Sequence, residues 1–129
     1  MRVALMILLG LVIGVIGTVN VMNTLSQRNP MPKAVMHMMG YHMGELGHAL
    51  KAKQCEVAKI QNHLERMQSM ASDIVPVFGS GEKDFNDHAA LLQTRLQAAV
   101  TAAPASCAAL AVVLKPINDA CKSCHQKYR

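Results

Sequence analysis

The sequence predicts an all-α protein, an antiparallel up-down-up-down four-helix bundle preceded by an N-terminal transmembrane helix. Apolar residues recur at intervals of three and four in four successive segments, which is the period of an amphipathic helix. Short segments rich in Pro, Gly or Ser separate them, and short connections favour antiparallel neighbours. An uncharged run precedes all four segments, and no segment has the pattern of a strand.

Composition limits the function. At 129 residues, the chain has room for one domain and an appendage. Its formal charge of +5 is modest, and its aromatic side chains other than histidine are Tyr41, Phe78, Phe85 and Tyr128. Stacking on bases therefore has little support, and we expect no nucleic-acid partner. A core this poor in aromatic groups needs another large apolar group, around which ten methionines supply flexible packing.

The N-terminal residues 1–25 are predicted to be a signal anchor. Residues 3–22 are uncharged and long enough to cross a membrane, and Arg2 before them favours a cytoplasmic N-terminus. A cleaved signal peptide, which usually has an apolar region of about 7–15 residues and an A-x-A-like exit, is the alternative. Gly10 and Gly14 form the G-x-x-x-G pattern typical of paired helices, so a homodimer is a further alternative.

Residues 26–32 are predicted to be a linker because they contain two prolines, and residues 33–129 to be the bundle domain. The first helix is expected over 33–53. Its three glycines suggest the close approach of something bulky, because glycine weakens a helix. The apolar stripe of this helix consists of Met36, Met39, Met43, Leu46 and Leu50.

Three further helices are expected over 56–74, 84–101 and 107–128. Pro76 and the glycines after it should break the chain after the second helix, Ser106 is the expected N-cap of the fourth, and Pro116 should kink the fourth. The inward residues of these helices are Ile60, Leu64, Met67, Ala71 and Ile74, then Phe85, His88, Leu92, Leu96 and Ala99, then Leu110, Leu114, Ile117, Cys121, Cys124 and Tyr128.

The C-terminus contains a C-x-x-C-H motif, Cys121 to His125, which is the attachment signature of c-type haem. Two thiols three residues apart on a helix lie on one face, where each can add to a haem vinyl group. The histidine that follows offers an imidazole nitrogen to the iron. We therefore predict one covalently bound haem c, held by Cys121 and Cys124, with His125 as the proximal iron ligand.

Other interpretations of the motif are weaker. A bare C-x-x-C suits a redox dithiol or half of a zinc site. His125 favours haem over both, and no second C-x-x-C exists that could complete a zinc site. A chance match at the end of the chain is the remaining alternative. The sequence contains no arrangement of nucleophile and base and no paired carboxylates, so a hydrolytic activity has no support.

Residues 33–129 resemble the class II c-type cytochromes, the cytochrome c-prime family and its low-spin, methionine-ligated relatives. The resemblance is carried by residues 120–129, by residues 34–43, which look like the family's haem-facing segment, and by residues 82–87. It implies a four-helix bundle with haem near one end and the first helix over its distal face. Pro32 stands where the family often carries an arginine, so the resemblance implies no arginine near the propionates.

The distal iron ligand decides the function. The resemblance places Met36 there, whereas periodicity alone leaves Met39 and Met43 as competitors. A methionine ligand gives a low-spin haem of raised potential, suited to electron transfer. We therefore expect a carrier of single electrons in a periplasmic respiratory chain, and not an enzyme. The alternative is a five-coordinate cytochrome c-prime that binds nitric oxide or another small gas.

Several residues are assigned to the surroundings of the haem. Gly40, Met43 and Phe85 are expected beside it, and the resemblance adds Arg129 near the proximal histidine. Of the other histidines, His37 and His42 lie off the apolar stripe and are expected at the surface. Structural or surface roles are expected for His48, His63 and His88.

Basic residues and the membrane segment predict the partners and location. Lys122, Lys127 and Arg129 either form a docking rim for an acidic redox protein or lie on a solvated helix end, where cations are favourable. Since c-type haem is attached outside the bacterial inner membrane, we expect an anchored protein on the periplasmic side. A soluble periplasmic protein, after signal cleavage, is the alternative.

The two cysteines outside the motif are predicted to form a disulfide. Cys55 lies in the turn after the first bundle helix and Cys107 opens the fourth, so an up-down-up-down bundle brings both to the same end. Thiols outside the inner membrane tend to be oxidised. The bond would stabilise the fold by about 3–4 kcal/mol in the chain-entropy estimate. Two unpaired thiols are the alternative.

Overall fold

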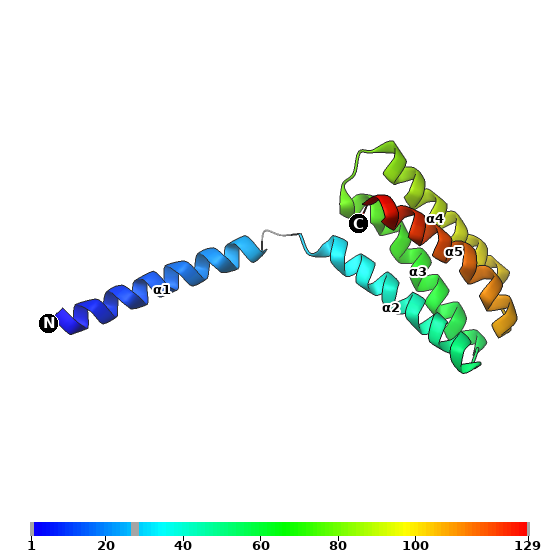
Figure 1. Ribbon diagram of the computed structural model, residues 1–129, viewed down its shortest axis with the longest axis horizontal. Coiled ribbons are helices and arrows are strands. Elements are labelled where there is room, and N and C mark those ends of the chain that lie inside the picture. Colours follow the sequence, from blue (N-terminus) through cyan, green and yellow to red (C-terminus); the bar gives the residue numbers. More distant parts are fainter. Residues whose placement is uncertain (1, 27–28, 129) are drawn as a thin grey trace. The chain divides into compact units, whose positions relative to one another are not determined.

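The computed structural model describes residues 2–26 and 29–128, and it is all-helical in these ranges, as predicted. The chain divides into two units, Met1–Pro30 and Met31–Arg129, which are described separately. Figure 1 labels the helices, which are α1 (Arg2–Ser26), α2 (Met31–Ala52), α3 (Val57–Phe78), α4 (Lys83–Ala102) and α5 (Cys107–Tyr128).

Helix α1 forms the first unit, and its segment Val3–Thr24 is long and apolar enough to cross a membrane. Threonine and asparagine side chains in this segment bond to the helix itself, at Thr18, Asn20 and Thr24. The Thr18 hydroxyl donates to the Gly14 carbonyl at 2.8 Å, and the Asn20 amide donates to the Ile16 carbonyl at 2.8 Å. Such bonds reduce the cost of placing these groups in hydrocarbon. A membrane anchor and a signal sequence are both consistent with this helix.

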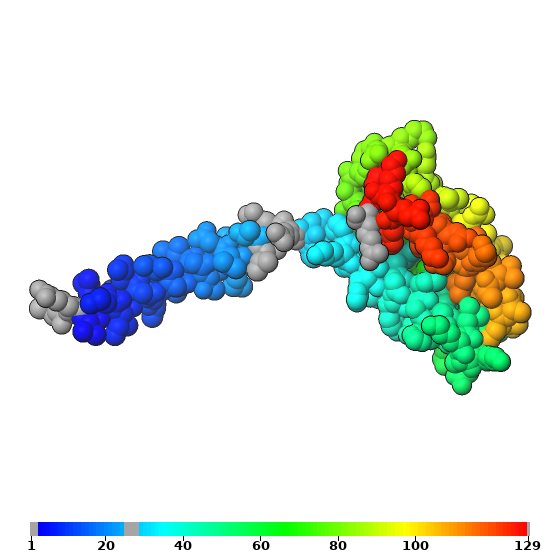
Figure 2. All heavy atoms as spheres, in the orientation of Figure 1, coloured from blue at the N-terminus to red at the C-terminus, as the bar shows by residue number. Residues whose placement is uncertain are grey.

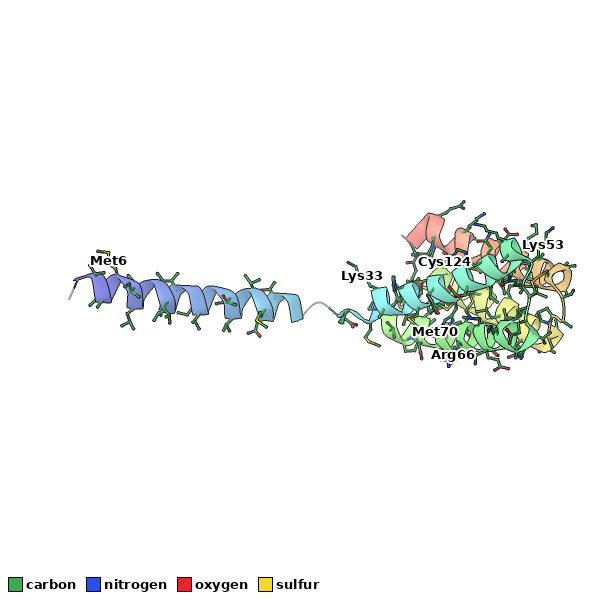
Figure 3. The ribbon with its side chains drawn as sticks, turned by 90° about the horizontal axis from the view of Figure 1, so that it is seen from below. Met6, Lys33, Lys53, Arg66, Met70 and Cys124 are labelled. Atoms are coloured by element: carbon green, nitrogen blue, oxygen red, sulfur yellow. A yellow bond between two sulfur atoms is a disulfide. The ribbon has the colours of Figure 1, made fainter. Side chains whose placement is uncertain are left out.

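The second unit consists of α2 to α5, in which each helix contacts the next and α5 also contacts α2. Lys33, near the start of α2, and Cys124, near the end of α5, lie toward one end of this unit, and Lys53 lies at the other (Figure 3). The core contains all five predicted inward residues of α3 and four of the five predicted for α4. On α4, Ala89 is buried and the predicted His88 is only half-buried.

Helix α2 buries its predicted stripe in part: Met39 and Leu46 are in the core, and Met36, Met43 and Leu50 pack against it. Val35, Met39, His42 and Leu46 are buried, whereas Met36 is only partly covered. The surface assignment of His42 was therefore wrong, since its side chain is 4% exposed. Apolar periodicity did not identify His42 as buried, because one edge of α2 faces the core and the neighbouring edge faces the cavity described below. His37 is exposed, as predicted.

Two helix boundaries also differ. Helix α3 continues through Pro76 to Phe78 and ends at Gly79, whose φ of 62° is left-handed and whose amide donates to the Val75 carbonyl at 3.0 Å. The expected break at Pro76 was wrong because a proline removes only one helical hydrogen-bond donor. Helix α2 begins at Met31, two residues earlier than expected, because Pro32 is tolerated in a first helical turn.

The predicted disulfide is present. Cys55 and Cys107 are bonded, and their Cα atoms are 5.3 Å apart. The predicted N-cap of α5 is also confirmed, because the Ser106 hydroxyl accepts a hydrogen bond from the Ala109 amide at 3.1 Å. Together these features fix the start of α5 against the turn between α2 and α3.

A histidine pair joins α2 to α3. The Nδ1 atoms of His42 and His63 are 2.8 Å apart, so one ring must donate to the other. The Nε2 atom of His42 is buried and has no hydrogen-bond partner among the described residues. Burial of His42, and then the nearby His63 and Arg66, lower its pKa below the usual value, while Glu45 acts in the opposite direction. The folded protein therefore favours the neutral form of His42 more strongly than the unfolded chain does.

Replacing both disulfide cysteines with serine should lower the free energy of unfolding by up to about 4 kcal/mol, because the bond closes a loop between residues 52 positions apart. Urea unfolding of Cys55→Ser/Cys107→Ser, beside the unaltered protein, measures this loss. The C-x-x-C-H motif is intact in this variant. An unchanged midpoint would contradict a stabilising role for the bond.

Acidification should destabilise the fold through His42. In the unfolded chain this histidine binds a proton near its usual pKa of 6.5, whereas the folded protein binds it only at lower pH. The contribution of His42 to stability is therefore fully present above about pH 6.5 and is lost as the pH falls from there through the lower pKa of the folded state. The urea midpoint should fall between about pH 7.5 and about pH 5, and His42→Leu should flatten this decline. A His48→Gln control, altered on the exposed face of α2, should behave like the unaltered protein.

Candidate functional site

A cavity of about 840 Å³ lies in the second unit, and helices α2 to α5 all contribute to it. Cavities that hold cofactor-sized ligands have volumes of roughly 300–1,000 Å³, so this one is large enough. Most of its lining side chains are apolar. The lining residues are Lys33, Ala34, Met36, His37, Met39, Gly40, Met43, Met67, Ile74, Phe78, Phe85, His88, Ala89, Leu92, Asn118, Cys121, Cys124, His125 and Tyr128.

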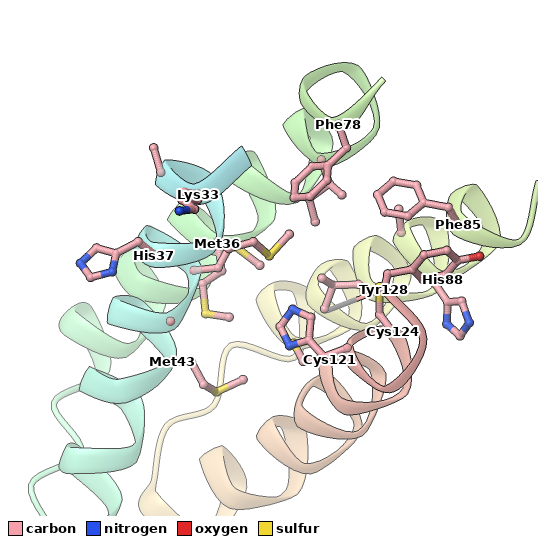
Figure 4. A pocket seen from close by; sticks show the side chains of 18 of the residues that line it. Lys33, Met36, His37, Met43, Phe78, Phe85, His88, Cys121, Cys124 and Tyr128 are labelled. Carbon is pink, nitrogen blue, oxygen red and sulfur yellow. The ribbon is translucent and has the colours of Figure 1, made fainter. Parts of the chain in front are cut away.

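Helices α2 and α5 form opposite walls of this cavity. Figure 4 shows Met36 and Met43 of α2 pointing across it toward Cys121 of α5, while His37 points away. Gly40 lies between the two methionines, and a Cβ atom added there would meet nothing within 4 Å. The wall of α2 therefore leaves room for a flat group. Gly44 has equally open surroundings but does not line the cavity, so the expected close approach was wrong there.

The C-x-x-C-H motif occupies the last turns of α5, on the wall opposite α2. Cys121 and Cys124 are half-buried free thiols, and His125 is exposed at the cavity. Burial raises the pKa of both thiols, and the nearby Asp84 carboxylate raises that of Cys124 further. Redox-active dithiols have lowered pKa values instead, so these two are poor nucleophiles at neutral pH.

The start of α4 holds the end of α5. The Tyr128 hydroxyl donates to Asp84 at 2.6 Å and also lies 3.1 Å from Glu82, and the Lys127 ammonium donates to Asp84 at 2.8 Å. These bonds lower the pKa of Asp84, that to Lys127 having the largest effect. The Tyr128 ring meets Phe85 edge to face, with ring centres 5.2 Å apart. Figure 2 shows the end of α5, in red, against the light-green segment around the start of α4.

The structure brings the predicted site residues of α2, α4 and α5 together. Cys121, Cys124, His125 and Met36 all line the one cavity, as do Gly40, Met43 and Phe85. Arg129 lies outside the described residues. The Cys55–Cys107 disulfide is not part of the lining, and Cys55 borders a second cavity instead.

Sequence reasoning missed several residues of the lining. Phe78 was placed in a chain break, and only the continuation of α3 past Pro76 brings it to the cavity, with its ring centre 5.6 Å from that of Phe85. The aromatic character that Phe78 shares with Phe85 was the one sequence feature that could have indicated its place at the cavity. Met67 and Tyr128 were assigned to the core, and Lys33 had no assignment.

No protein-family model matches the chain, and no curated protein sequence or solved structure matches it either. Within residues 2–26 and 29–128, no group of three or more His, Cys, Asp and Glu side chains is arranged to hold a bare metal ion. The site is therefore interpreted from its own residues. Paired half-buried thiols, an adjacent imidazole and a methionine-lined apolar cavity fit a haem better than they fit a single ion.

A leucine at position 40 should block the cavity without disturbing the fold. Gly40 lines the cavity and an added Cβ atom meets nothing within 4 Å, so the leucine of Gly40→Leu would narrow the cavity, and leucine favours a helix over glycine by roughly 0.5–1 kcal/mol. We expect covalent haem per protein, measured from pyridine haemochrome absorbance, to fall severalfold. Gly44→Leu makes the same change one turn away, outside the cavity, and should keep full haem content. Equal haem content in both variants would contradict the assignment of this cavity.

Proposed function

We propose that this chain binds one haem c and carries single electrons on the periplasmic side of the bacterial inner membrane. The observation that supports this most is the position of the C-x-x-C-H motif. Cys121, Cys124 and His125 all lie on the wall of an apolar cavity of about 840 Å³. A chance motif at a frayed terminus would have no reason to face such a cavity.

The proposal includes the fold type. Helices α2 to α5 would form the antiparallel up-down-up-down bundle of the class II c-type cytochromes, with haem near the end opposite the disulfide. Contact of each helix with the next, and of α5 with α2, supports this arrangement. The disulfide supports it too, since it joins the α2–α3 turn to the start of α5.

Each residue of the cavity has a defined task in this proposal. Cys121 and Cys124 would hold the haem through two thioether bonds, and His125 would supply the proximal nitrogen. Once bound, haem supplies a one-electron couple between its ferric and ferrous states. Phe78, Phe85 and the methionines exclude water from the ring, which favours the less charged state.

Met36 is the proposed distal ligand, and Met43 is its nearest competitor. The two side chains are seven residues apart on α2, which is about 10.5 Å along the helix axis, so they cannot both lie over the iron. Both are partly buried and reach into the cavity, whereas Met39, which also lines it, is packed in the core at 6% exposed. The flexible thioether of either methionine can adjust to a ligand.

Gas binding is the second candidate function. The space beside Gly40 on the α2 wall favours gas binding. A small molecule could reach the distal side of the haem there if the Met36 side chain turned away from the iron. Dithiol redox activity is less well supported, since burial raises the pKa of both motif thiols. The spectrum of the protein distinguishes all three functions.

The proposed location and partners depend on α1 and on Lys122. Segment Val3–Thr24 would anchor the haem domain to the membrane, or be removed as a signal. Lys122 is exposed beside the motif and could meet an acidic redox protein. Lys127 contributes less to such a rim because it is paired with Asp84. A homodimer through the glycines of α1 is a further part of the hypothesis.

The ferrous protein should have a sharp low-spin alpha band that carbon monoxide does not change. Met36→Ala should remove the distal ligand and give a high-spin spectrum that shifts when carbon monoxide is added. Met43→Ala, the matched control, removes the same side chain two turns away and should remain low-spin. A high-spin unaltered protein would support gas binding instead. Absence of a Soret band would overturn the haem proposal.

A further inference from the structure

We propose that Asp84 is the positioning residue of the haem site, which fixes the last turn of α5 and sets the charge at that edge of the haem. The inference deepens the proposed function and rests on it. Asp84 does not belong to the C-x-x-C-H motif or to the cavity lining. It acts from α4 on residues some forty positions later in the chain.

The first argument is the convergence of donors on one oxygen. Oδ2 of Asp84 accepts hydrogen bonds from the Tyr128 hydroxyl at 2.6 Å and from the Lys127 ammonium at 2.8 Å, while Nε2 of His88 lies 3.6 Å away. Two consecutive side chains of α5 are thus tied to one carboxylate. Hydrogen bonds to a charged acceptor are stronger than neutral ones.

The second argument is that this turn needs an external support. The last carbonyl groups of a helix have no hydrogen-bond partner within it, so the last turn is held less firmly than the turns before it. Tyr128 lies one turn after Cys124 and on the same side as His125, three residues earlier. The imidazole of His125 makes no hydrogen bond with the described residues, so its direction depends on the backbone of this turn.

The third argument is electrostatic. Asp84 is hydrogen-bonded to Lys127 and Tyr128, which follow His125 by two and three residues, so its charge lies beside the motif. A carboxylate at this edge favours the more positive, oxidised form of a bound haem. Replacing it with an amide should therefore raise the reduction potential as well as loosen the turn.

Asp87 provides a matched control on the same helix. It lies three residues after Asp84, and its carboxylate pairs with Lys83 at 2.6 Å. This pair joins two exposed positions of α4 and involves no residue of α5. Asp87→Asn therefore removes the same charge from the protein without releasing Lys127 or Tyr128.

The experiment compares the haem-loaded full chain with its Asp84→Asn, Asp84→Glu, Tyr128→Phe and Asp87→Asn variants. Amide hydrogen exchange of residues 124–128 reports the turn, and the reduction potential and the visible spectrum report the haem site. For Asp84→Asn we expect about tenfold faster exchange and a higher potential. Asp84→Glu should restore both in part, and Asp87→Asn should match the unaltered protein.

Tyr128→Phe separates the two effects and keeps the test usable if Asp84→Asn folds poorly. It keeps the aromatic ring on Phe85 and the charge of Asp84 but loses the hydroxyl bond, so exchange should accelerate with a smaller shift in potential. Equal exchange and equal potential in Asp84→Asn and Asp87→Asn would overturn the inference. Faster exchange with an unchanged potential and spectrum would show a purely structural contact, which would also overturn it.

The failure of this inference is distinguishable from failure of the proposed function. If the unaltered protein has no Soret band, the haem proposal fails, and the role assigned to Asp84 fails with it whatever the exchange rates are. If the haem is attached and only the Asp84 comparison is negative, the proposed function stands and the positioning role is wrong.

Discussion

The cavity in the second unit has to be kept from collapsing, and the rest of that unit depends on this constraint. An apolar space of about 840 Å³ among only four helices invites the helices to close over it, because burial of apolar surface favours contact. The structure resists closure by fixing α5 twice. The Cys55–Cys107 disulfide holds its start, and the Asp84 carboxylate holds its last turn through Lys127 and Tyr128. Between these points α5 is a stiff wall.

The same helix changes its role along its length. Leu110, Leu114 and Ile117 are buried in the core, and one turn later Cys121 and Cys124 are only half-buried at the cavity. A single apolar stripe thus supplies first the core packing and then the two thiols that face the cavity. This explains why the motif is held in a defined direction: the helix that carries it is packed on α4 along its length and tied down at both ends.

Sequence patterns predicted what depends on local chemistry. The four amphipathic segments, the C-x-x-C-H motif and the Ser106 cap all carry short-range signals, and the structure has each of them. The Cys55–Cys107 disulfide joins residues 52 positions apart and was predicted from the bundle topology instead. His42 and Asp84 could not be found in this way, because their partners His63, Lys127 and Tyr128 are distant in sequence. Pro76 led to the wrong prediction of where α3 ends, because a proline usually marks a helix end but α3 continues through it to Phe78. Phe78 was missed as a direct consequence.

Helix α2 shows why its stripe was the least predictable. It must present one edge to α3, where His42 meets His63, and a neighbouring edge to the cavity, where Met36 and Met43 reach across. Two adjacent faces on one helix blur a three-four repeat, so periodicity combined core residues such as Met39 with cavity residues such as Met36 and assigned His42 to the surface. Methionine suits this divided role because its unbranched thioether packs against protein or turns toward a ligand at little cost. The hydrogen bond between His42 and His63 holds the other edge in place, so movement of Met36 need not shift the helix. The methionines of α2 can therefore adjust at the cavity while the helix itself stays fixed on α3 through His42 and His63.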